Sequence, residues 1–396
     1  MLLESFPDLP AAHWSSGAAL QSAMARLAGR VTSPALVVDG ARWRQLLLAI
    51  ADEVPALTNA WRCVAWRSGM PAGLLQLPAA ARAGVSVGTP ADAVLALEAG
   101  LPFVLARGRA WSVAQMTEWV ASGVLPDLAS VSQIERWGGE SALPRQIGLQ
   151  WHPWAGGGGE AGPATMLGAG YGRVGLDDLL ARYSLEIVQL QVSCSGWLDA
   201  RDRTQEAISG RLDTLIGMVD RLQGLKRLVL TGDWLVWAAS MASTHPEVTE
   251  RLEEAAAGWE AAGVDIVLHD GTAIWQGASV LVGSILSADD VSDERRVVVV
   301  DVPSGLRSAQ VLASLPDRLG DVCGHWLAAQ RDLTTEWLAT DVAMTRLQAG
   351  DLMVLAGRHL ADGVMPGTPG LGVWLAEGET LVSLAAGTDP AEGDAN

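Results

Sequence analysis

The side chains best suited to proton transfer in this chain are histidines and aspartates that follow predicted strands. His269 and Asp270 follow one β-branched run, Asp233 follows another, and His152 follows a third. If the carboxyl ends of these strands meet, an aspartate beside an imidazole can move a proton. The same groups resemble a carboxylate–imidazole metal set, but no HxH or HxxxH spacing supports it, so we predict no metal. Alternatively, each histidine is a hydrogen-bonded loop residue.

A second set of residues is suited to binding a ligand. Arg67 and Arg173 could hold a carboxylate through paired hydrogen bonds, or could form salt bridges with the many acidic residues. The aromatic candidates follow predicted strand ends, apart from a histidine in the later β region: Trp66, Trp151, Trp197, Trp234 and His359. In a barrel the tryptophans would converge on one cavity. They would either plug it or line an apolar pocket for a flat ligand, and the sequence leaves both open.

Composition excludes several partners and limits the chemistry. The formal net charge is −18, so nucleic acid and anionic membrane surfaces would be repelled. The 27 basic residues include one lysine, Lys226, so a Schiff base would have to use it. No apolar run approaches the roughly 18 residues of a membrane span. Three cysteines without CxxC spacing, and a start unlike a signal peptide, predict a cytoplasmic protein.

The elements that must position these residues alternate between strands and helices from residue 34 to about 270. The predicted strands are Ala35–Asp39, Arg62–Ala65, Val85–Val87, Phe103–Ala106, Asp127–Val131, Ile147–Trp151, Glu186–Ser193 and Arg227–Thr231. Helices fill the gaps, and one opens at Thr89 with signals typical of a helix start, a capping threonine followed by Pro90. Eight strand–helix units favour an α/β fold of the (β/α)8 barrel type, with a doubly wound sheet as the alternative.

After residue 270 the pattern changes to strands with little helix between them. The predicted strands are Ala278–Ile285, Arg296–Val302, Asp351–Leu355, Gly372–Leu375 and Thr380–Leu384. They predict a separate, antiparallel β domain. We therefore expect a segment over 1–30 that packs on the β domain, a barrel over 31–268, the β domain over 269–386 and a disordered tail over 387–396.

Four segments, taken in order, resemble the fold-type III pyridoxal-phosphate decarboxylases, which act on ornithine, diaminopimelate and arginine. Thr32–Asp39 resembles the opening strand of that family, and Thr89–Gly100 resembles its Ser-Gly-Gly-Glu-Leu…Ala-Gly segment. Gly172–Gly175 resembles Ser-Lys-Phe-Gly, and Gly350-Asp351 resembles a Gly-Asp before a turn that contacts the cofactor. The resemblance runs from about residue 30 to 385. It implies a barrel, a following β domain and a head-to-tail dimer.

The cofactor motifs of that family are replaced here. Its Ala-Val-Lys-Ala-Asn falls on Val64–Ser68, which places Trp66, or less favourably Arg67, at the lysine. The other replaced motifs are the ring-stacking histidine segment at Gln191–Gly196, the glycine phosphate loop at Thr231–Asp233, the Glu-Pro-Gly-Arg at His269–Thr272, the partner-subunit segment at Trp326–Asp332 and the Gly-Ala-Tyr turn at Gly357–His359. Lys226 begins a predicted strand, at the end opposite to barrel chemistry. We therefore predict no pyridoxal phosphate and no internal aldimine.

Three functions remain open from the sequence. The leading hypothesis is a pseudoenzyme that serves as a partner or regulatory subunit, as a homodimer or as a heterodimer with an active decarboxylase-like chain. The alternative is a cofactor-independent enzyme that uses His269, Asp270, Asp233 and His152 on a small metabolite in a tryptophan-lined mouth. The third is a decarboxylase that is still active.

Overall fold

A computed structural model describes residues 34–53, 57–108, 111–151, 176–194, 205–232, 246–269, 273–292, 294–302, 310–315, 322–331, 334–345, 347–356, 366, 371–377 and 380–384. The chain divides into two compact units. One comprises Met1–Pro7, Leu47–Ser68 and Pro78–Gly271, and the other Asp8–Leu46, Gly69–Leu77 and Thr272–Asn396.

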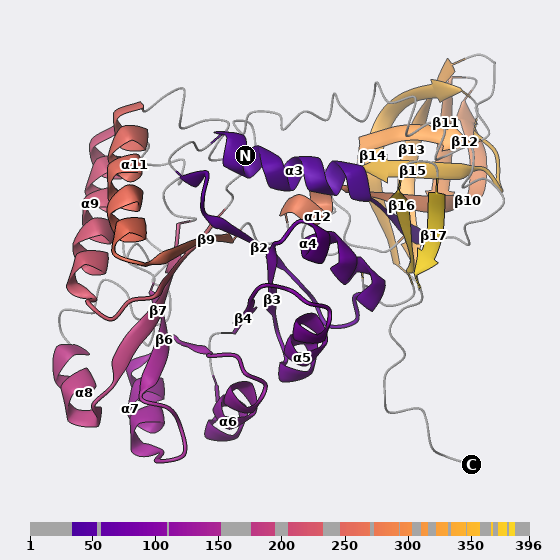
Figure 1. The fold of residues 1–396 in the computed structure, drawn as a ribbon. Coiled ribbons are helices and arrows are strands. Elements are labelled where there is room, and N and C mark those ends of the chain that lie inside the picture. The colour runs from indigo at the N-terminus through magenta and orange to yellow at the C-terminus, as the bar shows by residue number, and fades with distance from the viewer. Residues whose placement is uncertain are drawn as a thin grey trace, which may run out of the picture. The chain divides into compact units, whose positions relative to one another are not determined.

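Eight parallel strands form a nearly closed barrel in the first unit, in the order β4-β3-β2-β9-β8-β7-β6-β5 (Figure 1). Their bounds are β2 (Trp61–Ala65), β3 (Gly84–Val87), β4 (Val104–Ala106), β5 (Asp127–Leu128), β6 (Gln146–Trp151), β7 (Glu186–Ser193), β8 (Arg227–Thr231) and β9 (Asp265–His269). Each strand runs parallel to its neighbours, as strand–helix–strand connections require. The predicted (β/α)8 barrel is confirmed.

Helices lie around the outside of these strands (Figure 1). They are α5 (Pro90–Glu98), α6 (Val113–Ala121), α7 (Val131–Gly139), α8 (Leu176–Tyr183), α9 (Gln205–Arg221) and α11 (Pro246–Ala261). The predicted helix start at Thr89 is confirmed, because its hydroxyl accepts the Asp92 amide at 3.1 Å. Ser112 starts α6 in the same way, through a capping box with Gln115. None of the helices in the described ranges is both long and apolar enough to cross a membrane.

The predicted first barrel strand belongs to the other sheet. Residues Ala35–Asp39 form β1, which pairs with β10 (Ser279–Ser292) and with β16 (Gly372–Glu377). The barrel is instead completed by β9, which pairs with β2 and β8. The prediction was wrong because β1 is an apolar strand followed by a helix, α3 (Gly40–Glu53), and this local pattern is that of a barrel unit. Only pairing with strands more than 200 residues away distinguishes the two cases.

The second unit contains a nine-stranded sheet. Its other strands are β11 (Arg295–Val300), β12 (Gln310–Leu315), β13 (Val322–Arg331), β14 (Thr334–Thr345), β15 (Leu352–Ala356) and β17 (Thr380–Leu384). The short helices η2 (Ala72–Leu75) and α12 (Ala273–Gly277) belong to the same unit, and the short helix α4 (Gln76–Ala80) contains the boundary between the units. The sheet is mixed rather than wholly antiparallel, because β1 runs parallel to β16 and β11 parallel to β13. The predicted β domain is otherwise present, with β12, β13 and β14 as strands that the sequence analysis did not predict.

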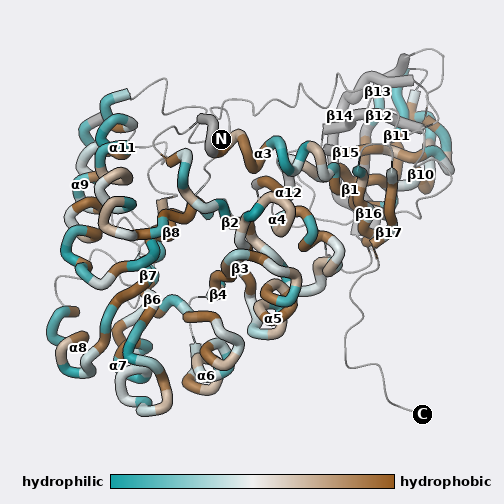
Figure 2. The backbone as a smooth tube through the Cα atoms, viewed as in Figure 1, coloured by the Kyte–Doolittle hydropathy of each residue, from teal (hydrophilic) through white to brown (hydrophobic). Residues whose placement is uncertain are grey.

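The core of this sheet is apolar, and hydrophobic colour follows β1, β10 and β16 in Figure 2. A buried cluster joins side chains from several of its strands: Leu36, Leu281, Ile285, Val298, Val300, Val302, Leu327, Leu347, Met353, Leu355 and Leu371. Their packing supplies the dry face on which the sheet depends.

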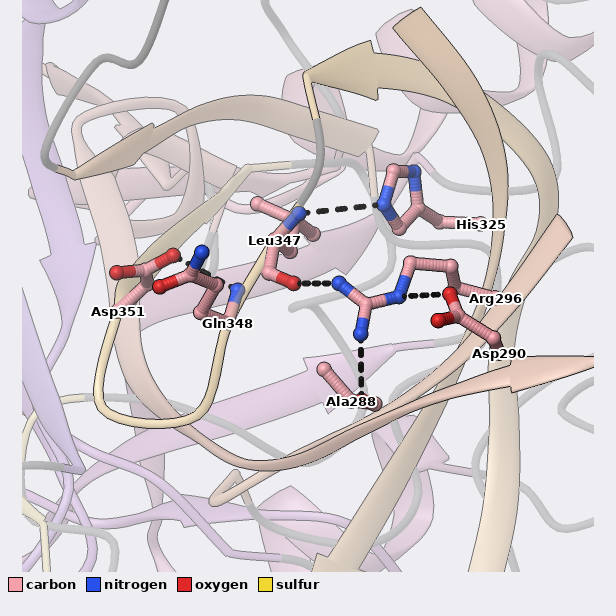
Figure 3. A network of polar contacts seen from close by, with 7 residues as sticks. All are labelled: Ala288, Asp290, Arg296, His325, Leu347, Gln348 and Asp351. Atoms are coloured by element: carbon pink, nitrogen blue, oxygen red, sulfur yellow. Dashed lines mark hydrogen bonds and ion pairs between the residues drawn. The ribbon is translucent and has the colours of Figure 1, made fainter. Parts of the chain in front are cut away.

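A polar network holds the turn before β15, where the Gly350-Asp351 motif lies (Figure 3). Gly350 has a φ of 90°, which favours glycine, and the Asp351 carboxylate accepts the Gln348 amide at 2.8 Å. Arg296 donates to the carbonyl oxygens of Leu347 and of Ala288, the latter at 2.7 Å. It also pairs with Asp290, and the Leu347 amide lies 3.5 Å from Nε2 of the buried His325. The motif is therefore a fixed structural turn.

Candidate functional site

Strand alternation identifies the side chains that enter the barrel interior. Cys63 of β2, Leu105 of β4, Val229 of β8 and Val267 of β9 form one buried cluster with Phe103. Because these strands are spread around the barrel, a shared cluster places all of these side chains inside it. Side chains two residues further along each strand lie on the same face. The interior at the carboxyl ends is therefore lined by Ala65, Arg107, Thr231 and His269.

Ser86 and His269 meet across this interior. The Ser86 hydroxyl lies 2.7 Å from Nε2 of His269, and both side chains are buried. They come from β3 and β9, which are separated by β2. The β2 residue paired with Ser86 is Ala65, whose small side chain leaves room for the hydrogen bond to pass over it. This bond forms the floor of the barrel mouth.

The environment of His269 favours its neutral form. Burial, and then the charge of Arg107, lower the pKa of His269 to about 4. At neutral pH the ring is therefore uncharged and can accept a proton. Its Nδ1 atom is buried and has no hydrogen-bond partner among the described residues. The ring thus presents a second polar atom that a bound molecule could satisfy.

Two arginines give the mouth positive charge. Arg107 directly follows β4, and its amide continues the ladder by donating to the Val87 carbonyl at 2.7 Å. Its side chain is accessible to solvent over part of its surface. Burial of the remainder, and then the charge of nearby Arg67, lower the pKa of Arg107. Arg67 follows β2 and is half-buried. The Arg107 guanidinium is charged at neutral pH and lies close enough to act on both His269 and Arg67.

Amide and hydroxyl groups lie on β8, β7 and β6, the strands that follow β9 around the barrel, and Thr231 is the register partner of His269. The Gln191 amide donates to the Thr231 hydroxyl at 3.1 Å, between β7 and β8. Gln150 lies on the same face of β6 as Gly148, and its Oε1 atom is buried without a partner in the described part of the chain. The described side chains on this part of the interior are therefore polar and uncharged.

Four of the predicted site residues lie in the described ranges. His269 ends β9 and Arg67 follows β2, so both lie at the carboxyl ends of barrel strands. Trp66 and Trp151 are buried, but alternation assigns them to the strand faces opposite Ala65 and Gln150, away from His269. The other seven lie outside the described residues: Asp270, Asp233, His152, Arg173, Trp197, Trp234 and His359. Whether tryptophans plug or line the mouth stays a prediction.

The position expected for a cofactor lysine carries none. The side chain that faces the interior at the end of β2 is Ala65, one residue before the position that the motif alignment favoured. The exposed Lys226 precedes β8, where its amide donates to the Val188 carbonyl at 2.9 Å. This is the amino end of the barrel strands, opposite to the mouth. Across the described ranges, no three His, Cys, Asp or Glu side chains are grouped to hold a metal.

Sequence reasoning missed Ser86 and Arg107. Both could have been found by extending the alternation of their own strands, because Ser86 lies on the face of Gly84 and Arg107 on the face of Leu105. It also missed a buried polar cluster at the amino end of the barrel. That cluster had no recognisable spacing, since its members come from three distant strands.

The amino-end cluster joins Asp127, Gln189 and Arg227. The Gln189 amide donates to the Asp127 carboxyl at 2.7 Å, and Arg227 donates to the Gln189 carbonyl at 3.2 Å. The Arg227 guanidinium also lies 5.3 Å from the centre of the Phe103 ring. Burial raises the pKa of Asp127 to about 7, against the opposing effects of Gln189 and Arg227. These groups therefore form a hydrogen-bonded chain from a carboxyl group to a guanidinium, although Oδ2 of Asp127 and Nε of Arg227 are buried without a partner among the described residues.

Comparison with known proteins identifies the fold. No protein-family model matches the sequence, and no curated protein sequence matches it. Among solved structures, a diaminopimelate decarboxylase aligns with 93% of this chain and 95% of its own, at 15% identity and a TM-score of 0.70. The arginine decarboxylase of Paramecium bursaria Chlorella virus aligns with 90% of this chain and 100% of its own, at 13% identity and a TM-score of 0.66.

A third structure extends the likeness to another substrate class. The lysine/ornithine decarboxylase of Vibrio vulnificus aligns with 86% of this chain and 92% of its own, at 14% identity and a TM-score of 0.61. Likenesses at such low identity establish the fold alone. The chain thus has the fold of the fold-type III pyridoxal-phosphate decarboxylases, which confirms the resemblance that its motifs indicated.

Proposed function

We propose that this protein is a decarboxylase-like pseudoenzyme that has lost pyridoxal-phosphate chemistry and acts as a partner or regulatory subunit. The observation that carries the proposal is the residue at the end of β2. Ala65 faces the interior there, and the only lysine of the chain lies at the opposite end of the barrel strands. Without an amine at the mouth, the aldehyde of the cofactor has no partner for a Schiff base.

The other groups at the mouth also fit the cofactor poorly. A protonated pyridine nitrogen requires a negative partner, but the motif alignment puts His269 there, and its lowered pKa keeps it neutral. The Ser86–His269 bond crosses the space above Ala65, which a lysine side chain from β2 would have to enter. We therefore derive no reaction step through pyridoxal phosphate.

The proposed role as a subunit rests on the family resemblance. Family members form head-to-tail dimers, so a degenerate chain could complete or modulate an active one, as a heterodimer or within a homodimer. A cytoplasmic location is part of the proposal. It is supported by Cys63 and Cys194, which are free and buried thiols.

Two experiments test the proposed function. The purified protein, supplied with pyridoxal phosphate, should release no carbon dioxide from diaminopimelate, arginine, lysine or ornithine. Co-expression with a decarboxylase-like chain of the same organism should yield a complex, or should change the activity of that chain. Turnover by the protein alone would contradict the loss of chemistry. A partner that neither co-purifies nor changes in activity would contradict the subunit role.

A second candidate is a cofactor-independent enzyme that uses His269 as a base. The observation that favours it is the buried contact between the Ser86 hydroxyl and Nε2 of His269, whose ring is neutral at neutral pH. The roles of Asp270, Asp233 and His152 remain predictions in this scheme. Incubating small carboxylated metabolites with the protein in heavy water would test it. Proton exchange that His269→Gln abolishes would support it, and no exchange with any of them would count against it.

A further inference from the structure

We propose that the barrel mouth binds a small anion, a carboxylate or a phosphate ester, through Arg107 over the floor formed by Ser86 and His269. This deepens the proposed function, because it assigns a ligand to the mouth that the cofactor no longer uses. Binding of such a ligand at the mouth would give the proposed regulatory subunit an effector. Three features of the mouth support an anion rather than a neutral or cationic ligand.

The first feature is the position of Arg107. Its backbone is fixed by the bond to Val87, and Leu105 sets the face on which its side chain lies, so the guanidinium is presented at the carboxyl end of β4. The side chain is exposed, which lets a ligand reach it from solvent. A guanidinium offers a planar pair of donors that matches a carboxylate or a phosphate.

The second feature is the sign of the charges that act on Arg107 and His269. In the described part of the mouth, the groups that act electrostatically on Arg107 and His269 are cationic. The carboxylate of Asp92 in α5 accepts hydroxyl donors from Ser68 at 2.5 Å and from Thr89 at 2.7 Å. It is thereby held at the start of its helix, where it also favours the positive helix end. An anion bound to Arg107 would offset the positive charge that acts on His269.

The third feature is the uncharged Ser86–His269 pair, in which Nδ1 of His269 has no described hydrogen-bond partner. If the Ser86 hydroxyl donates to Nε2, the neutral ring carries its proton on Nδ1. That atom is buried and has no partner among the described residues. It could donate to an anion without a change of its own charge. Because the ring stays neutral, the floor adds hydrogen-bonding capacity but leaves the charge to Arg107.

Binding can be measured on the full chain with simple probes. We would titrate inorganic phosphate and, separately, malonate into the protein at constant ionic strength, with sodium chloride as reference, and follow the melting temperature and the heat of binding. At least one probe should bind. Arg107→Gln should weaken that binding at least ten-fold, whereas Arg136→Gln, a charge-matched change on the exposed face of α7, should leave it unchanged.

The outcomes separate the ligand classes and the two proposals. Binding of phosphate alone would indicate a phosphorylated ligand, and binding of malonate alone a carboxylate. Arg107→Lys, which keeps the charge but loses the fork, should recover only part of the affinity. No binding of either probe, or equal binding by the wild type and Arg107→Gln, would overturn the anion site. An aldimine spectrum with pyridoxal phosphate would instead contradict the proposed function, whatever the anions do.

Discussion

The two ends of the barrel differ in how their buried polar side chains are arranged and charged. At the amino end, Asp127, Gln189 and Arg227 form a chain of hydrogen bonds that links a carboxyl group to a guanidinium, with Oδ2 of Asp127 and Nε of Arg227 left without a described partner. At the carboxyl end, the Ser86–His269 pair is neutral, the added charge is positive, and one imidazole nitrogen has no described partner. A cluster that links a carboxyl group to a guanidinium within the fold stabilises that fold, whereas an exposed guanidinium beside a neutral imidazole can bind a ligand.

This difference follows the division of labour seen in barrels generally. Residues at the amino ends of barrel strands contribute to stability, and those at the carboxyl ends bind and react. In this chain the carboxyl end has kept its polar lining but not an amine. The comparison predicts that changes at the amino end alter unfolding, and that changes at the mouth alter binding and the titration of His269.

The largest expected effect is on pH dependence at the amino end. The pKa of Asp127 is raised from 3.8 to about 7 by folding, so the folded state holds the proton more tightly than the unfolded state. Its contribution to stability is complete below pH 3.8 and is lost as the pH rises through about 7. Asp127→Asn should therefore be more stable than the wild type at pH 8, by on the order of 4 kcal/mol, and similar at pH 4.

Urea unfolding of both proteins from pH 4 to 8 would measure this change. The difference between variant and wild type should grow with pH and level off above about pH 7. Parallel pH profiles for variant and wild type would mean that Asp127 does not titrate in this range, and would contradict a raised pKa in the amino-end cluster.

The next largest effect is the pH dependence due to His269 at the mouth, where stability falls as the pH is lowered. The pKa of His269 is lowered from 6.5 to about 4 by folding, so the unfolded state binds the proton more tightly. The contribution of the neutral His269 ring to the free energy of unfolding is complete above pH 6.5. It is lost as the pH falls through about 4, by on the order of 3 kcal/mol. His269→Gln should remove this loss. Unfolding series on both proteins would check it, and a variant that keeps the full acid loss would contradict the assignment.

A matched pair of substitutions on one strand compares the two ends directly. Gln189 and Gln191 lie on the same face of β7, two residues apart. Gln189→Leu breaks two hydrogen bonds within a buried cluster and should lower the free energy of unfolding by about 3 kcal/mol. Gln191→Leu breaks one bond, to Thr231, and should cost about 1 kcal/mol. Equal costs, measured by urea unfolding, would remove the distinction between the ends.

The sequence predicted that a barrel forms, but it was less accurate about which strands belong to that barrel. Seven of the eight predicted barrel strands lie in the barrel, because alternating strand and helix signals are local. β1 was misplaced because its partners, β10 and β16, are distant in sequence, and pairing cannot be judged from a β-branched run. The strands β12 to β14 were missed for a related reason. Much of their length consists of alanine, glutamine and charged residues, which are weak strand signals.

The candidate site was only partly predictable. His269 was found from the motif alignment, which puts it where the family has a glutamate. Its partner Ser86 lies more than 180 residues away on a strand that is not its neighbour. Trp66 was favoured for the lysine position on motif alignment alone. The one-residue difference from Ala65 reverses the face of the strand, and that face could be fixed only from the cluster that Cys63 joins across the barrel.

The most direct test of the central claim is whether the protein can hold pyridoxal phosphate as an aldimine. The purified protein would be incubated with the cofactor, reduced with borohydride, freed of small molecules and digested for mass spectrometry, with Lys226→Arg as the control for incidental reaction. We predict no visible aldimine band before reduction and no stoichiometric pyridoxyl peptide after it. A stoichiometric adduct on Lys226, with an aldimine spectrum that Lys226→Arg abolishes, would contradict the account.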